Sequence, residues 1–343
     1  MRQLSNASGE DTMNTAKLVT LATAMSLAAS NYASANLNQQ AINTQHRNED
    51  STMQQIELNT QVGKLAANLY LPSDVANPPV VIVTGAWTTV KEQMPAVYAE
   101  ALAEQGYAAI TFDFRGWGQS ADATPFLEDP SRKTDDIRAV IDAIGDLPQV
   151  DSSRIAGLGI CASAGYMLDA VAGNDKISAA AVVAPWLHDP AMATAIYGGE
   201  ESAQGLLALA ADAANSAEPV VIEAASLTNE QALMYQAPYY TETDRGLIPE
   251  YDNQFNVASW DGWLNYDAQQ SAAAQDKPVL MVASEAMALP AGAHQYLDAT
   301  NVNPNSQVDA VWLDDISQFD FYDQPQAVSQ AVAAITEHFA KQL

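Results

Sequence analysis

The sequence predicts an α/β protein in which a mostly parallel sheet lies between two layers of helices. Unbroken apolar, β-branched runs such as residues 79–84 are typical of strands buried on both faces. These runs alternate with stretches of helical spacing, which is the order that produces a parallel sheet. The alternation stops at residue 190 and resumes after residue 274, so we also expect an inserted segment in this three-layer sandwich.

Residues 1–35 have the pattern of a secretory signal peptide. An apolar run at residues 18–29, too short to span a bilayer, precedes the small residues Ala33 and Ala35. We predict cleavage after Ala35, with Met13 as an alternative start. The mature protein is therefore expected to be periplasmic or secreted.

The rest of the sequence is predicted to comprise an arm, a main domain and an insertion. Residues 36–51 are polar and rich in Asn and Gln, which favours a flexible arm. Residues 52–343 form the main domain, and residues 190–274 interrupt it as a helical cap over the active site. The aromatic side chains of this cap either form its own core or contact a substrate.

Strands and helices are assigned from periodicity and from flanking Gly and Pro residues. The first two strands alternate apolar and polar residues, which is typical of an edge hairpin. Strands are predicted at residues 52–58, 63–71, 79–84, 107–112, 154–160, 177–183, 278–283 and 307–313. Helices are predicted at residues 91–105, 131–147 and 326–341, with a further helix starting near residue 166.

The composition limits the classes of partner. The chain has 42 acidic and 14 basic residues and a formal net charge of -28, which argues against nucleic acid and anionic membrane surfaces as partners. A single Cys excludes an intramolecular disulfide and a zinc site built from cysteines. The pattern implies no metal or organic cofactor, and it makes no prediction of oligomeric state.

Residues 159–163 connect a predicted strand to a predicted helix through small residues. Cys161 lies between Gly159 and Ser163, which fits a strained elbow that exposes a nucleophile above the sheet. The helix N-terminus would favour the thiolate form. An alternative register makes Ser163 the nucleophile, and a third interpretation is that Cys161 is a buried structural thiol.

A second motif follows the strand at residues 107–112: residues 113–120 read Asp-x-Arg-Gly-x-Gly-x-Ser. Together with the elbow at Cys161 and the loop that starts at Gly85, this motif resembles the α/β-hydrolases, in particular the dienelactone-hydrolase-like branch. Cys can be the nucleophile in that branch. The resemblance covers residues 52–343 and implies a small-molecule acyl substrate bound under the cap.

The resemblance implies positions for an oxyanion hole and an acid. One backbone N–H group would come from Ala162 and a second from Ala86 or Trp87. The expected acid is Glu285, which follows the strand at residues 278–283, and Asp189 is the alternative.

The catalytic His that the resemblance implies is absent, because Gln318 occupies its slot and Gln cannot act as a general base. His188, oriented by Asp189 or Glu285, is the leading candidate for the base. His294 is a weaker candidate, and we expect His46 and His338 to play no catalytic part. We therefore expect a hydrolase for ester, thioester or lactone bonds, with a non-catalytic ligand-binding protein as the alternative.

Overall fold

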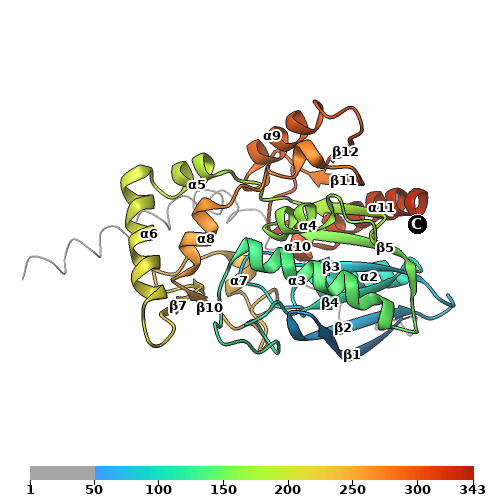
Figure 1. The fold of residues 1–343 in the computed structure, drawn as a ribbon, viewed down its shortest axis with the longest axis horizontal. Helices are drawn as coiled ribbons and strands as arrows, with labels where there is room; N and C mark the ends of the chain where they lie inside the picture. The colour runs from blue at the N-terminus through green and yellow to red at the C-terminus, as the bar shows by residue number, and fades with distance from the viewer. Residues whose placement is uncertain (1–50) are drawn as a thin grey trace, which may run out of the picture.

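A computed structural model describes residues 51–343 as a sheet with helices on both of its faces (Figure 1). The predicted signal peptide and nearly all of the predicted arm lie outside the described residues. Their cleavage and the export of the protein therefore stay predictions.

The main sheet has eight strands in the order β1-β2-β4-β3-β5-β6-β11-β12. β1 and β2 form an antiparallel hairpin, β2 is antiparallel to β4, and all pairs from β4 to β12 are parallel. The fold class is therefore as predicted. The strands are β1 (Ser51–Thr60), β2 (Gly63–Pro72), β3 (Pro79–Thr84), β4 (Ala108–Phe112), β5 (Asp151–Ile160), β6 (Ala179–Val183), β11 (Pro278–Ala283) and β12 (Gln307–Trp312).

The predicted hairpin has only one edge strand. Residues 67–70 of β2 pair with β4 in addition to β1, so β2 is an interior strand. Its alternation gives way to a run of buried residues in this stretch, including Leu69 and Tyr70. That run satisfies the need of an interior strand for apolar cover on both faces.

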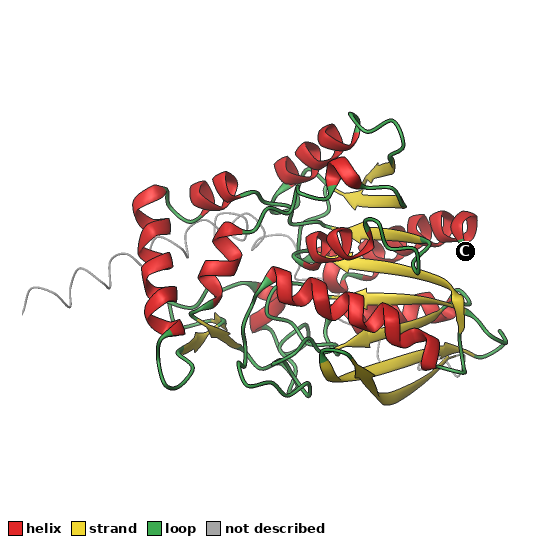
Figure 2. Ribbon diagram, in the orientation of Figure 1, coloured by secondary structure: helices red, strands yellow, loops and turns green. Residues whose placement is uncertain are grey.

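The helices form two layers, one on each face of the sheet (Figure 2). Helix α2 (Met94–Glu104) contacts α11 (Pro325–Gln342), whereas α3 (Pro130–Ala143) contacts α4 (Ser163–Val171). The chain reverses its direction across the sheet between β4 and β5. Right-handed crossovers then place α2, before this reversal, and α3 and α4, after it, on opposite faces, and α11, which follows the last strand, lies on the face of α2. The other helices outside the insertion are α9 (Pro290–Thr300), α10 (Asp320–Asp323) and the 3₁₀ turn η1 (Ile144–Asp146), and a second 3₁₀ turn, η2 (Ala272–Ala274), lies at the end of the insertion before β11.

The segment between β6 and β11 is inserted between two neighbouring strands of the sheet. Figure 1 shows most of it grouped beyond one end of the strands, at the left of the view. It is not purely helical, because it also holds two small two-stranded sheets. Its elements are α5 (Pro190–Ile196), α6 (Glu200–Ala214), β7 (Val221–Glu223), β8 (Ala225–Ser226), β9 (Met234–Tyr235), α7 (Pro238–Thr241), β10 (Gln254–Asn256) and α8 (Ser259–Asn265).

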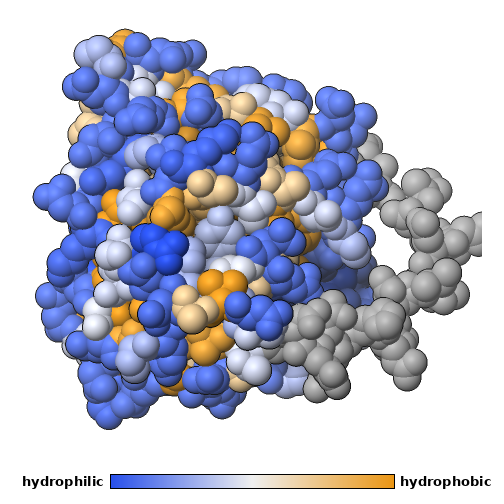
Figure 3. Space-filling view, turned by 90° about the vertical axis from the view of Figure 1, so that its right-hand side faces the viewer, coloured by the Kyte–Doolittle hydropathy of each residue, from blue (hydrophilic) through white to orange (hydrophobic). Residues whose placement is uncertain are grey.

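The face in Figure 3 is mainly hydrophilic and carries only small hydrophobic patches. Within residues 51–343, no helix combines the length and apolar character needed to cross a membrane.

Candidate active site

The turn from β5 into α4 has the geometry of a nucleophile elbow. Cys161 has φ 58°, a left-handed conformation that a residue with a side chain adopts only under strain. A Cβ on Gly159 would lie 2.5 Å from the Ser163 carbonyl oxygen and 2.9 Å from the Ala164 Cα. The turn therefore closes tightly only because residue 159 is glycine.

The hydroxyl of Ser163 is used inside this turn. Ser163 is fully buried, its Oγ donates to the Ile160 carbonyl at 3.1 Å, and it accepts the Ile160 N–H at 3.2 Å. Ser163 is also the first residue of α4, so the strained position belongs to its neighbour Cys161. Of the two registers considered from the sequence, the geometry favours the one centred on Cys161.

The thiol of Cys161 is enclosed, with 7% of the residue exposed. Burial raises the pKa of the Cys161 thiol to about 11, while hydrogen bonding from the Tyr322 hydroxyl and from the backbone N–H groups of Ala162 and Trp87 acts in the opposite direction. The thiol is therefore protonated at neutral pH. This differs from the expectation that the helix N-terminus would hold a thiolate, because desolvation outweighs the dipole.

Two backbone N–H groups act on the Cys161 thiol, because hydrogen bonding from each lowers its pKa. One belongs to Ala162 and the other belongs to Trp87, which are two of the three residues named for the oxyanion hole. The N–H of Ala86, the alternative to Trp87, instead points at the Met94 sulfur at 3.5 Å. The Trp87 ring packs against Phe255 and two further aromatic side chains of the insertion, Trp260 and Trp263, with the Phe255 and Trp263 centroids each 5.0 Å away.

Gln318 lies in a buried position, and its amide is fully engaged. Its Nε2 donates to the Ala184 carbonyl at 2.9 Å and to the Tyr322 hydroxyl at 3.1 Å, while its Oε1 accepts the Ala288 N–H at 3.0 Å. Gln318 therefore supports Tyr322, which in turn contacts Cys161. Burial and the neighbouring Cys161 raise the pKa of Tyr322 well above its usual value.

His188 is not joined to Cys161 by a hydrogen bond. Its Nδ1 accepts the Trp186 indole N–H at 3.1 Å, and its Nε2 lies 2.9 Å from the Trp263 carbonyl, to which it can only donate. Burial lowers the pKa of His188, which agrees with this neutral tautomer. Since both ring nitrogens are occupied, the arrangement does not support the expected role of His188 as the base.

The hydrogen bonds and the ion pair of the two expected acids are made to groups other than Cys161 and His188. Glu285 is exposed at the surface and pairs with His294 at 2.8 Å. Asp189 caps α5 by accepting the Met192 N–H at 2.7 Å, and it also accepts from Gln295 at 2.9 Å. Neither carboxylate orients His188 through a hydrogen bond.

Sequence reasoning missed Glu128, a fully buried carboxylate in the loop before α3. Its Oε2 accepts the Thr88 backbone N–H at 2.9 Å and its Oε1 accepts the Tyr166 hydroxyl at 3.0 Å. Lys133 pairs with it at 2.8 Å. Glu128 lies in no recognisable motif. The only sequence pattern that could have indicated Glu128 was its spacing of five residues before Lys133 at the start of a predicted helix.

The insertion contacts both loops that surround the thiol. The Tyr251 hydroxyl lies 3.1 Å from Thr88 Oγ1, next to Trp87. Arg245 donates to the Asp323 carboxylate at 2.7 Å and to the Phe319 carbonyl at 2.9 Å, and so fixes the loop that carries Tyr322. These contacts place part of residues 190–274 against the site.

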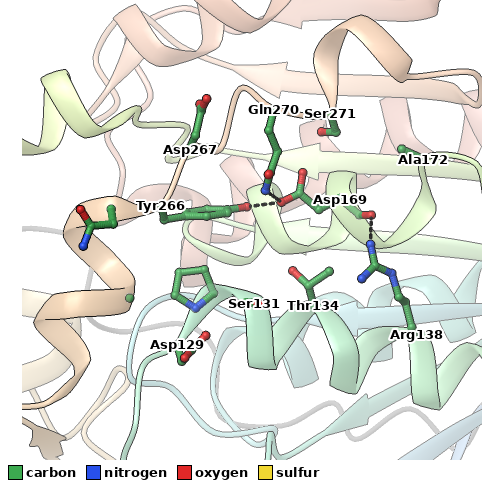
Figure 4. A pocket seen from close by; sticks show the side chains of 13 residues that line it. Asp129, Ser131, Thr134, Arg138, Asp169, Ala172, Tyr266, Asp267, Gln270 and Ser271 are labelled. Carbon is green, nitrogen blue, oxygen red and sulfur yellow. Dashed lines mark hydrogen bonds between the residues drawn. The ribbon is translucent and has the colours of Figure 1, made fainter. Parts of the chain in front are cut away.

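A cavity of about 630 Å³ lies between α3, α4 and the stretch from α8 to residue 271 (Figure 4). Asp169 lines it and accepts hydrogen bonds from Tyr266 at 2.8 Å and Gln270 at 2.6 Å. A second cavity of about 740 Å³ lies between α2 and α11. Cys161 lines neither cavity. No group of three or more His, Cys, Asp or Glu within residues 51–343 could hold a metal ion.

The fold is similar to that of known protein structures. The crystal structure of the hypothetical protein PA2218 from Pseudomonas aeruginosa matches with a TM-score of 0.73 and 24% identity, covering 89% of this chain and all of that one. The sequence of PA2218 is 35% identical over 127 residues, and YcjY of Escherichia coli K12 is 36% identical over 122. These sequence matches cover 36% and 35% of this chain, and only 34% and 40% of the relatives' own length. Both relatives are described as uncharacterized.

A sequence model described as "Esterase FrsA-like" matches residues 1–197, more than half of the chain. The finer resemblance to the dienelactone-hydrolase-like branch is not addressed by this match and stays a prediction. The sheet order, the elbow at Cys161 and this match together assign the fold and the family. The chain has an α/β-hydrolase fold and belongs to the FrsA-like esterase family.

Proposed function

We propose that this protein transfers or hydrolyses the acyl group of an ester, thioester or lactone through Cys161. The observation that carries the proposal is the strained Cys161 at φ 58° with the N–H groups of Ala162 and Trp87 beside its sulfur. Acyl transfer needs this combination, because the nucleophile must attack a carbonyl whose oxygen becomes an oxyanion between two donors. Membership of an esterase family supports the same reaction class.

The proposed proton path runs through Tyr322. As the sulfur forms its bond to the carbonyl carbon, the thiol proton passes to the Tyr322 oxygen, and the Tyr322 hydroxyl proton passes to the leaving oxygen. In an ester the C–O bond breaks and an alcohol leaves, in a lactone the same bond opens the ring, and in a thioester the C–S bond breaks and a thiol takes the proton, so no charge accumulates on Tyr322. Water then cleaves the thioester by the reverse relay. A general base contributes roughly 10²–10⁴-fold, so turnover without one is expected to be slow.

The test compares Cys161→Ala with Ser163→Ala on p-nitrophenyl acetate. We expect Cys161→Ala to abolish the acylation burst, because the attacking atom is removed. Ser163→Ala is expected to retain the burst and to lower the melting temperature, because Ser163 makes two hydrogen bonds within the elbow. A burst that survives Cys161→Ala and disappears with Ser163→Ala would move the nucleophile to Ser163.

A second candidate function is ligand binding without turnover. It is favoured by Gln318, whose amide is committed to three partners in the slot where a base is expected. This alternative predicts that an acyl ester raises the melting temperature of the protein and leaves no covalent adduct. An acyl group on Cys161 would exclude it.

A further inference from the structure

Glu128 joins the loop after β3 to helices α3 and α4. The carboxylate is fully buried and accepts hydrogen bonds from Thr88, Lys133 and Tyr166. An unpaired buried carboxylate is strongly destabilising, so a chain keeps one only where its oxygens are satisfied. Here Oε1 accepts from the Tyr166 hydroxyl, Oε2 accepts from the Thr88 N–H, and the Lys133 ammonium lies 2.8 Å from each oxygen.

The hydrogen bond to Thr88 connects Glu128 to the loop after β3, which also contains Trp87 of the proposed oxyanion hole. Thr88 has φ 63°, a left-handed conformation that is unfavourable for a β-branched residue and persists only where its surroundings enforce it. Thr88 directly follows Trp87, whose backbone N–H lowers the pKa of the Cys161 thiol by hydrogen bonding. The Thr88 N–H donates to Glu128 at 2.9 Å, so the carboxylate fixes the peptide on the far side of Trp87.

The charge of Glu128 is unfavourable for the chemistry proposed at Cys161. A negative group nearby opposes both a thiolate and an oxyanion. Lys133 offsets this charge at 2.8 Å, and its own ammonium lies 4.6 Å from the ring centres of Phe114 and Trp117. The hydrogen bonds of Glu128 therefore explain why a negatively charged residue occupies this position.

We infer that Glu128 is a positioning residue that holds the Trp87 N–H in the oxyanion hole through its hydrogen bond to the Thr88 backbone. The inference rests on the proposed acyl transfer at Cys161. It predicts that loss of the Thr88 acceptor slows attack on a carbonyl more than it slows reactions of the thiol that form no oxyanion.

Two double variants isolate the acceptor. E128Q/K133M and E128L/K133M both lack the buried charge pair, and they differ in whether residue 128 can accept hydrogen bonds from the Thr88 N–H and the Tyr166 hydroxyl. Replacing a buried ion pair by neutral groups of similar volume is often tolerated, which favours folding of both. E128D keeps the charge beside Lys133, withdraws the carboxylate by one methylene, and serves in place of the leucine variant if that one does not fold.

Each variant is treated with two probes in the full chain. Acetylation of Cys161 by p-nitrophenyl acetate passes through an oxyanion. Methyl methanethiosulfonate forms a methyl disulfide on Cys161, with methanesulfinate as the leaving group, and passes through no carbonyl adduct. The ratio of the two rates therefore reports the oxyanion hole separately from the reactivity of the thiol.

We expect this ratio to be at least about tenfold lower in E128L/K133M than in E128Q/K133M, since loss of one oxyanion donor costs roughly 10²–10³-fold. Equal ratios in the two variants would overturn the inference. A wild-type protein that reacts with the thiosulfonate and never with the ester would instead refute the proposed function.

Hydrogen exchange of the Thr88 amide tests the positioning role without any acylation. We expect faster exchange of this amide in E128L/K133M than in E128Q/K133M. Equal protection in both variants would overturn the inference even if the ester proves unreactive.

Discussion

At the scale of single residues, the site is defined by how Cys161 is buried. Removing the thiol from water raises its pKa to about 11, and the hydrogen bonds from Tyr322, Ala162 and Trp87 offset only part of that effect. A helix N-terminus and two N–H groups are thus insufficient to ionise this sulfur at neutral pH. The protein needs either a proton relay or an opening of the site to use it.

The pH dependence of thiol labelling tests this description. The thiolate is the reactive form, so labelling of Cys161 by methyl methanethiosulfonate should accelerate about tenfold per pH unit from pH 7 to 10. A rate that levels off below pH 8 would contradict the raised pKa.

Tyr322→Phe should slow this labelling by roughly five- to tenfold at a given pH, because a hydrogen bond of about 1 kcal/mol to the sulfur is lost. Tyr107→Phe is the matched control, since its hydroxyl contacts the Thr336 carbonyl on α11. An equal effect of both substitutions would show that the hydroxyl of Tyr322 has no specific role.

The sequence was more informative about the nucleophile than about its partners. The elbow could be predicted because a tight strand-to-helix turn demands small residues at fixed spacing around Cys161. The partners Tyr322 and Glu128 reach the site from distant parts of the chain, and only tertiary packing brings them there. His188 was a candidate base because it follows a strand whose end lies near the elbow. Its hydrogen bonds to Trp186 and Trp263 depend on tertiary packing, which the sequence does not reveal.

At the scale of elements, the elbow depends on the contact between β5 and the first turn of α4. Gly159→Ala places a Cβ 2.5 Å from a backbone oxygen, so the strand and helix must separate. We expect a loss of about 1–3 kcal/mol in the free energy of unfolding, measured by urea denaturation.

Gly205→Ala is the control for this substitution. Gly205 lies inside α6 with open space around its Cα, so alanine there should stabilise the protein by about 0.5–1 kcal/mol. A Gly159→Ala protein as stable as the wild type would contradict the tight packing of the elbow.

The strands of the sheet were predicted closely because their apolar runs are continuous. Pro79–Thr84 and Pro278–Ala283 have the predicted bounds. The insertion was harder, since β7 and β10 are strands of three residues that no periodicity can reveal. The interior position of β2 depends on its pairing with β4, which is a property of the whole sheet.

At the scale of the whole molecule, the dominant feature is the net charge of -28. Repulsion between surface carboxylates destabilises the compact state, and salt screens it over a distance that falls from about 10 Å at 0.1 M to about 3 Å at 1 M. We expect the melting temperature to rise by several degrees over this range.

Sodium chloride and choline chloride should raise the melting temperature equally, because screening does not depend on the identity of the cation. A rise with sodium alone would indicate a specific cation site. No change with either salt would contradict the role of surface repulsion.

The proposed function requires above all that the Cys161 thiol reacts as a nucleophile. The most direct measurement is intact mass spectrometry of the full chain after brief exposure to p-nitrophenyl acetate, followed by peptide mapping of any adduct. We predict one acetyl group, located on Cys161. An unmodified protein, or an acetyl group on Ser163 with Cys161 free, would contradict the central claim.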